Sequence, residues 1–131
     1  MIRTFPTSLN GTYSVTVRQE IRGKAVTFTV RGAFAETESG IQGSFEYSPA
    51  STGAELKSAL SEVDLYQIKC EGFRRGTLVQ LRFDNTLDHV DHFGACMVAA
   101  EKSGAWSGQW VGYSPENHGI ITGDISFIPL A

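Results

Sequence analysis

The segment DNTLDHVDH, residues 84–92, concentrates three aspartates and two histidines, residue types that bind metal ions or transfer protons. To bind zinc or non-haem iron, such side chains must converge on one ion. The candidate ligands are Asp88, His89, Asp91 and His92. Their spacing matches neither the calcium-binding loop nor the helical H-E-x-x-H motif. The pattern favours a hairpin loop whose aspartates bond to backbone N–H groups, with a metal site and a histidine–aspartate proton-transfer pair as alternatives.

A second group of candidate functional residues is aromatic and falls on the predicted inner faces of strands. Tyrosine and tryptophan combine an apolar ring with a polar tip, which suits them to orient a small apolar ligand. The expected ligand-binding residues are Tyr13, Phe28, Phe45, Tyr47, Tyr66, Trp106 and Trp110. Glycines on the same faces either leave room for a ligand or let the strands bend around a filled interior. These glycines are Gly32, Gly43, Gly72, Gly108, Gly112 and Gly123.

The elements that position these residues are strands, because apolar and polar residues alternate along most of the chain. The expected strands cover residues 13–19, 26–34, 40–47, 66–72, 77–84, 92–101, 106–113 and 120–128. A tight turn is expected at Arg22-Gly23, and connections at AETES (35–39) and FRRG (73–76).

One short helix is expected between the third and fourth strands. Thr52 and Glu55 have the spacing of a capping box, which satisfies free N–H groups at a helix start. An apolar stripe with helical spacing follows, formed by Leu56, Ala59, Leu60 and Val63.

Residues 1–131 are expected to form a single domain, since the length suits one core. An open eight-stranded sheet leaves two unpaired edges, and short connections favour an up-and-down path. We therefore predict an all-β fold, an eight-stranded antiparallel up-and-down barrel with the one helix. The alternative is a two-layer β-sandwich.

The two cysteines are too few for a disulfide-stapled secreted domain. Cys70 falls on the inner face of its strand. Phe93 and Met97 are expected to face inward, which puts Cys96 on the opposite face. Cysteines on opposite faces are poorly placed to form a disulfide.

Charge and composition argue against several partners. With 11 basic and 14 acidic residues the net charge is −3, and the basic residues are scattered, so neither nucleic acid nor a membrane surface is expected as a partner. No cofactor is expected. The first residues, MIRTFPTSLNGTYS, contain no apolar leader segment, which predicts a cytoplasmic protein or a secreted one whose leader has been removed.

The strand rhythm, with NGTYSV near the start and WSGQWVGY before GIITGDISF, resembles that of calycin-like barrels, the lipocalin-like and avidin-like proteins. The resemblance implies a small ligand held in the barrel mouth. It transfers no binding residue, because the lipocalin G-x-W motif is absent and Tyr13 follows Gly11 here. The first hypothesis, motivated by the glycines beside aromatic residues on the inner faces, is binding of a small apolar molecule. The alternatives are a protein- or glycan-interaction module, in which case a homo-oligomer is an option, and a barrel-cavity enzyme such as a cyclase or isomerase.

Overall fold

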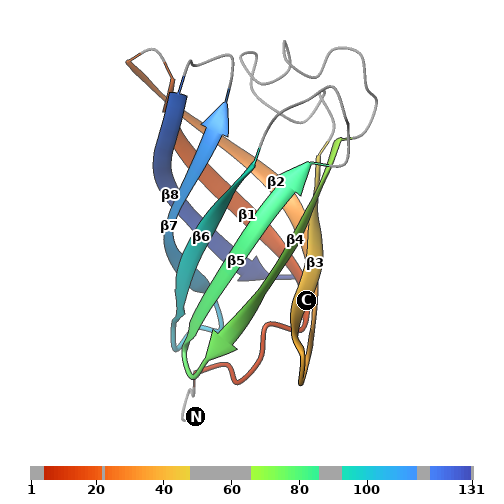
Figure 1. The fold of residues 1–131 in the computed structure, drawn as a ribbon. Coiled ribbons are helices and arrows are strands. Elements are labelled where there is room, and N and C mark those ends of the chain that lie inside the picture. The colour runs from red at the N-terminus through yellow and green to blue at the C-terminus, as the bar shows by residue number, and fades with distance from the viewer. Residues whose placement is uncertain (1–4, 22, 48–65, 86–92, 115–118, 131) are drawn as a thin grey trace.

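The computed structural model shows a closed antiparallel barrel in which each strand pairs with the next and the last pairs with the first (Figure 1). It describes residues 5–21, 23–47, 66–85, 93–114 and 119–130. The strands are β1 (Gly11–Ile21), β2 (Lys24–Thr37), β3 (Gly40–Tyr47), β4 (Tyr66–Arg75), β5 (Leu78–Asn85), β6 (Phe93–Ala100), β7 (Trp106–Ser114) and β8 (Gly119–Pro129). The predicted eight-stranded up-and-down barrel is confirmed, and the two-layer sandwich is wrong.

Two connections are shorter than predicted. Strand β2 continues through most of AETES to Thr37, and β4 continues through FRR to Arg75. Gly76, at a φ of 62°, turns the chain instead. The predicted turn at Gly23 is confirmed by its φ of 80° and by the pairing of Ile21 with Lys24. These residues join the strands because pairing in the closed sheet satisfies their backbone N–H and C=O groups. The sequence pattern assigns the same residues to loops.

The predicted helix falls within residues 48–65, outside the described residues. In the part of the chain that the structure describes, no helix is long and apolar enough to cross a membrane.

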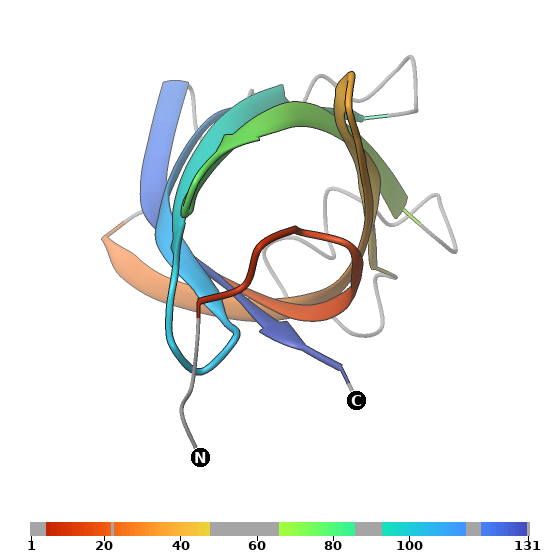
Figure 2. The same cartoon turned by 90° about the horizontal axis from the view of Figure 1, so that it is seen from below.

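The hydrophobic core fills the barrel toward one end, which we call the capped end. The β2–β3, β4–β5 and β6–β7 turns lie there, and residues 5–10 cross it (Figures 1 and 2). Leu9 from this crossing segment is fully buried in the core. The other core residues are Tyr13, Val15, Val30, Phe34, Ile41, Phe45, Cys70, Val79, Leu81, Cys96, Val98, Trp106, Ile125 and Phe127. The opposite end, where Gly23 turns the chain from β1 to β2, is called the far end.

Aromatic rings form the centre of this core. Phe34 stacks on Phe127 with ring centroids 5.3 Å apart, and Phe45 meets both rings edge-on at 5.6 and 6.0 Å. Tyr13 tilts against Phe34 at 5.8 Å. Such offset and edge-on pairs add to the stabilisation gained from burying the rings.

Inner-face glycines let the strands come close together in this barrel. A Cβ atom on Gly123 would lie 1.7 Å from the Arg18 carbonyl oxygen, and one on Gly72 would lie 1.8 Å from that of Gln80. Cβ atoms on Gly43, Gly94 and Gly108 would also lie within 2.3 Å of a neighbouring strand's carbonyl oxygen. These glycines are therefore needed for the close approach of neighbouring strands.

Aromatic side chains lie over several of these glycines. Cβ atoms on Gly32 and Gly43 would meet Phe34, one on Gly94 would meet Phe83, and those on Gly112 and Gly123 would meet Trp110, all at 2.9 Å or less. Much of the room that these glycines leave is thus filled by neighbouring rings.

The predicted orientation of β6 is wrong. Phe93 and Met97 are 50% and 54% exposed on the outer face, whereas Cys96 is buried inside the barrel with Cys70. The pairing of Leu81 with Cys96 sets this orientation. Both cysteines are free thiols, and β5 lies between their strands.

Candidate ligand-binding site

The seven predicted ligand-binding residues separate into three groups. Tyr13, Phe45 and Trp106 are buried in the core toward the capped end. Trp110 packs against the core and is only half-buried. Phe28, Tyr47 and Tyr66 belong to strands, but their side chains lie outside the described part of the chain.

Tyr13 and Trp106 bring polar atoms into this core. Burial raises the pKa of Tyr13, and the nearby indole N–H of Trp106 opposes that shift. Even so, the Trp106 Nε1 atom is buried and meets no acceptor within hydrogen-bond geometry among the described residues. The Tyr13 hydroxyl donates to the Asn10 carbonyl at 3.4 Å, which ties β1 to the crossing segment.

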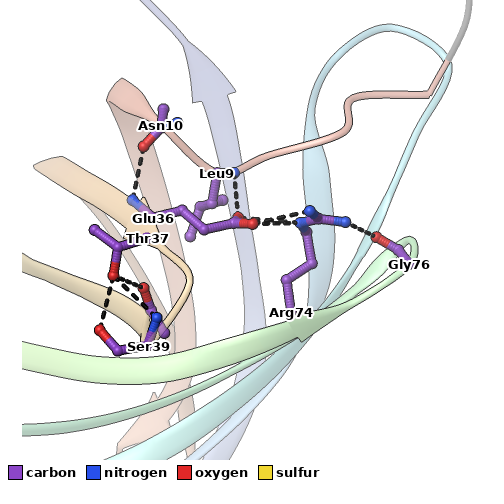
Figure 3. Close-up of polar contacts among 8 residues, drawn as sticks. Leu9, Asn10, Glu36, Thr37, Ser39, Arg74 and Gly76 are labelled. Atoms are coloured by element: carbon purple, nitrogen blue, oxygen red, sulfur yellow. Dashed lines mark hydrogen bonds and ion pairs between the residues drawn. The ribbon is translucent and has the colours of Figure 1, made fainter.

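An ion pair locks the capped end (Figure 3). Arg74 Nε lies 3.0 and 2.9 Å from the two carboxylate oxygens of Glu36, and the Arg74 Nη1 atom donates to the Gly76 carbonyl at 2.9 Å. The same carboxylate accepts the Leu9 N–H at 3.0 Å, and the Asn10 side chain accepts the Glu36 N–H at 2.7 Å. The hydrogen bonds from Arg74 hold the pKa of Glu36 below its usual value. These contacts fasten the crossing segment to β2 and β4.

The inner face changes character toward the far end. Val17, Ile68, Phe83 and Trp110 face the interior and pack against the core, but they are half-buried rather than buried. Gln19 faces inward on β1 beyond Val17 and is 8% exposed. These five residues form the candidate site. Gln19 was not predicted as a site residue. The signal that could have identified it is its polar side chain at the end of the inward-facing series Tyr13, Val15, Val17 and Gln19.

Trp110 and Gln19 are brought together by the barrel seam. Gly123 of β8 pairs with Trp110 on one side and with Gln19 on the other. The indole N–H of Trp110 donates to the Arg18 carbonyl at 3.1 Å. An amide and an indole thus flank one glycine on the inner wall.

The two thiols do not supply a nucleophile. Burial raises the pKa of Cys70 and of Cys96 to about 12, so both stay protonated near neutral pH. They pack as small apolar side chains, and the enzyme hypothesis remains a prediction without support from them.

The metal prediction lies outside the described residues, because Asp88, His89, Asp91 and His92 all fall within residues 86–92. Within the described ranges, no cluster of histidine, cysteine, aspartate or glutamate side chains is suited to hold a metal ion.

Comparisons with protein-family models, with curated proteins and with solved structures find no match to this chain.

Proposed function

We propose that the barrel binds a small, largely apolar molecule in its far half, against Val17, Ile68, Phe83 and Trp110. The observation that carries this proposal is the gradient of burial along the inner face. Residues near the capped end are buried against one another, whereas these four face inward and keep accessible surface. Ligand sites in proteins are typically concave and apolar, with few polar groups.

The capped end does not offer such a site. Its rings contact one another, and the Glu36–Arg74 ion pair holds the crossing segment in place. A ligand would have to displace packed side chains there, at a cost of several kcal/mol. In the far half, a ligand would instead cover apolar surface that the chain leaves accessible, which yields about 25 cal/mol per Å².

Filling the far half from β1 is expected to weaken binding. In Val17→Trp the indole occupies interior space, so affinity for the neutral dye Nile red should fall about tenfold or more, a loss of about 1.4 kcal/mol. The dye's fluorescence, titrated with protein, measures the affinity. Thr16→Trp places the same side chain on the outer face of β1 and is expected to leave binding unchanged, because neighbouring strand residues point to opposite faces.

Two results would contradict this proposal. One is the absence of dye binding by the wild-type protein, and the other is equal binding by folded Val17→Trp and Thr16→Trp proteins. Thermal unfolding of both variants shows whether overpacking, which costs about 1–3 kcal/mol, has unfolded the first.

A second candidate function, self-association, is favoured by the outer face of β6 and β7. Phe93, Tyr113 and Ile120 form one row across β6, β7 and β8, and Ile120 is 76% exposed. The rings of Phe93 and Tyr113 lie 5.6 Å apart. The outward residues described on β6 and β7 are all uncharged: Phe93, Ala95, Met97, Ala99, Ser107, Gln109, Val111 and Tyr113.

A second copy of the chain fits this surface best. In a twofold dimer the same patch meets itself, so an uncharged patch pairs without repulsion although the chain carries a net charge of −3. Charged residues begin on the flanking strands, with Asp84 on β5 and Asp124 on β8.

Tyr113→Lys is expected to dissociate such a dimer, because twofold symmetry places two like charges at the interface. Sedimentation analysis up to about 100 µM, which covers micromolar dissociation constants, should show dimer for the wild type and monomer for the variant. The control Thr29→Lys on the outer face of β2 should remain dimeric. A wild-type protein that stays monomeric over this range would rule out self-association.

A further inference from the structure

We infer that the ligand of the far half is a planar, uncharged ring compound with an amide-like edge. Gln19 recognises this edge, and the ring of the ligand stacks on Trp110. This inference rests on the proposed binding function and goes further by naming the ligand chemistry. It is carried by two residues that flank Gly123 on the inner wall, Gln19 with an amide that bonds to no other described residue and Trp110 with an indole that reaches the Arg18 carbonyl.

Gln19 is the buried polar side chain of the described interior, and its amide bonds to no other described residue. Among the described residues, Trp106 Nε1 is the side-chain nitrogen or oxygen atom that is both fully buried and without a hydrogen-bond partner. The amide atoms of Gln19 also lack a protein partner, so they must keep some access to solvent. A ligand that displaced this solvent without replacing its hydrogen bonds would leave the amide unpaired, at a cost of about 1–3 kcal/mol. A ligand that supplies both a donor and an acceptor avoids this cost.

Trp110 restricts the shape of the ligand. Its N–H is already bonded to the Arg18 carbonyl, and its ring lies against Gly112 and Gly123 along the wall. The indole can therefore contact a ligand through the face of its ring. The face of an aromatic ring prefers another planar group in offset stacking.

The side chains described on the inner face of the far half favour a neutral ligand. Val17, Ile68, Phe83 and Ile121 present apolar side chains to the far half. The charged inner-facing side chains in the described chain, Glu36 and Arg74, lie at the capped end and neutralise each other. Burying a charged ligand without a counter-ion costs far more than burying a neutral one.

The Gln19 amide defines the edge that the ligand must carry. A glutamine side chain presents a carbonyl oxygen and an NH₂ group next to each other, so it pairs with a neighbouring N–H and C=O in a two-point contact. Lactam rings and ring carboxamides have such an edge, whereas fatty acids and plain hydrocarbons do not.

The test compares two probes of nearly equal size, 2-quinolinone, which has a lactam edge, and naphthalene, which has none. Titration calorimetry should show that wild-type protein binds 2-quinolinone about tenfold more tightly, as expected for hydrogen bonds worth about 1.4 kcal/mol. In Gln19→Leu this preference should disappear, with naphthalene affinity unchanged or higher. Gln42→Leu, which removes an exposed glutamine from the outer face of β3, should retain the preference.

Equal wild-type affinity for the two probes would overturn the role of Gln19 and leave the proposed function standing, since both still bind. A preference that persists in Gln19→Leu would do the same. If neither probe binds while Nile red does, the ligand class is wrong but the binding function holds. If none of the three binds, both proposals fall.

Discussion

Gly123→Ala is expected to destabilise the barrel by about 3 kcal/mol, the upper part of the range for overpacking. The added methyl group would lie 1.7 Å from the Arg18 carbonyl oxygen and 2.8 Å from Trp110 Nε1. The first of these contacts is to backbone, which cannot turn aside as a flexible side chain does.

The position of Gly123 makes this strain costly. It pairs with Gln19 at the seam where β8 returns to β1, and that seam closes the barrel. Moving β1 away would also break the hydrogen bond from Trp110 to Arg18. Relief of the clash therefore requires part of the seam to open, exposing backbone groups that are otherwise paired.

A matched control lies on the same strand. No atom of the described residues lies within 4 Å of a Cβ built on Gly119, so Gly119→Ala is expected to be neutral or slightly stabilising. Urea unfolding followed by tryptophan fluorescence measures both variants. Equal stability of the two alanine variants would contradict the close approach of β8 to β1.

Glu36→Gln is expected to cost about 2 kcal/mol at neutral pH, because it leaves the partly buried Arg74 guanidinium without a counter-charge. Glutamine retains an oxygen that can accept the Leu9 N–H, so the substitution mainly reports the loss of charge. Chemical denaturation at pH 7 measures the change.

The pH dependence of this contribution has a definite sign. Hydrogen bonds from Arg74 lower the pKa of Glu36 in the folded state relative to the unfolded chain. Its stabilising contribution is therefore complete above the unfolded pKa, near 4.3, and is lost as the pH falls through the lower folded value. The wild type should lose stability in this acid range, and Glu36→Gln should lose less.

The Glu71–Arg82 ion pair provides the control, since its side chains are 60% and 72% exposed on the outer face of β4 and β5. Solvent screens such pairs, and Glu71→Gln should change stability by less than about 1 kcal/mol. If Glu36→Gln proves no more costly than Glu71→Gln, the ion pair does not hold the capped end.

Some of these features could be predicted from sequence alone and others could not. Alternation along β1 identified Tyr13 and Val17 as inward-facing, and Gln19 shares their face in the same pattern. In β6 the pattern failed, because Phe93 and Met97 on one face are as apolar as Cys96 and Val98 on the other. Such a strand carries no polar face to mark its orientation.

The sequence by itself determined that this chain is a β protein with eight strands and a turn at Gly23, because strand periodicity and turn chemistry act between near neighbours. Only the tertiary structure decided which residues meet across the barrel. Glu36 and Arg74 are 38 positions apart, and Gln19 and Trp110 flank Gly123 only because β8 closes on β1. Local preferences do not specify closure, since pairing between distant strands depends on register and curvature along the whole sheet.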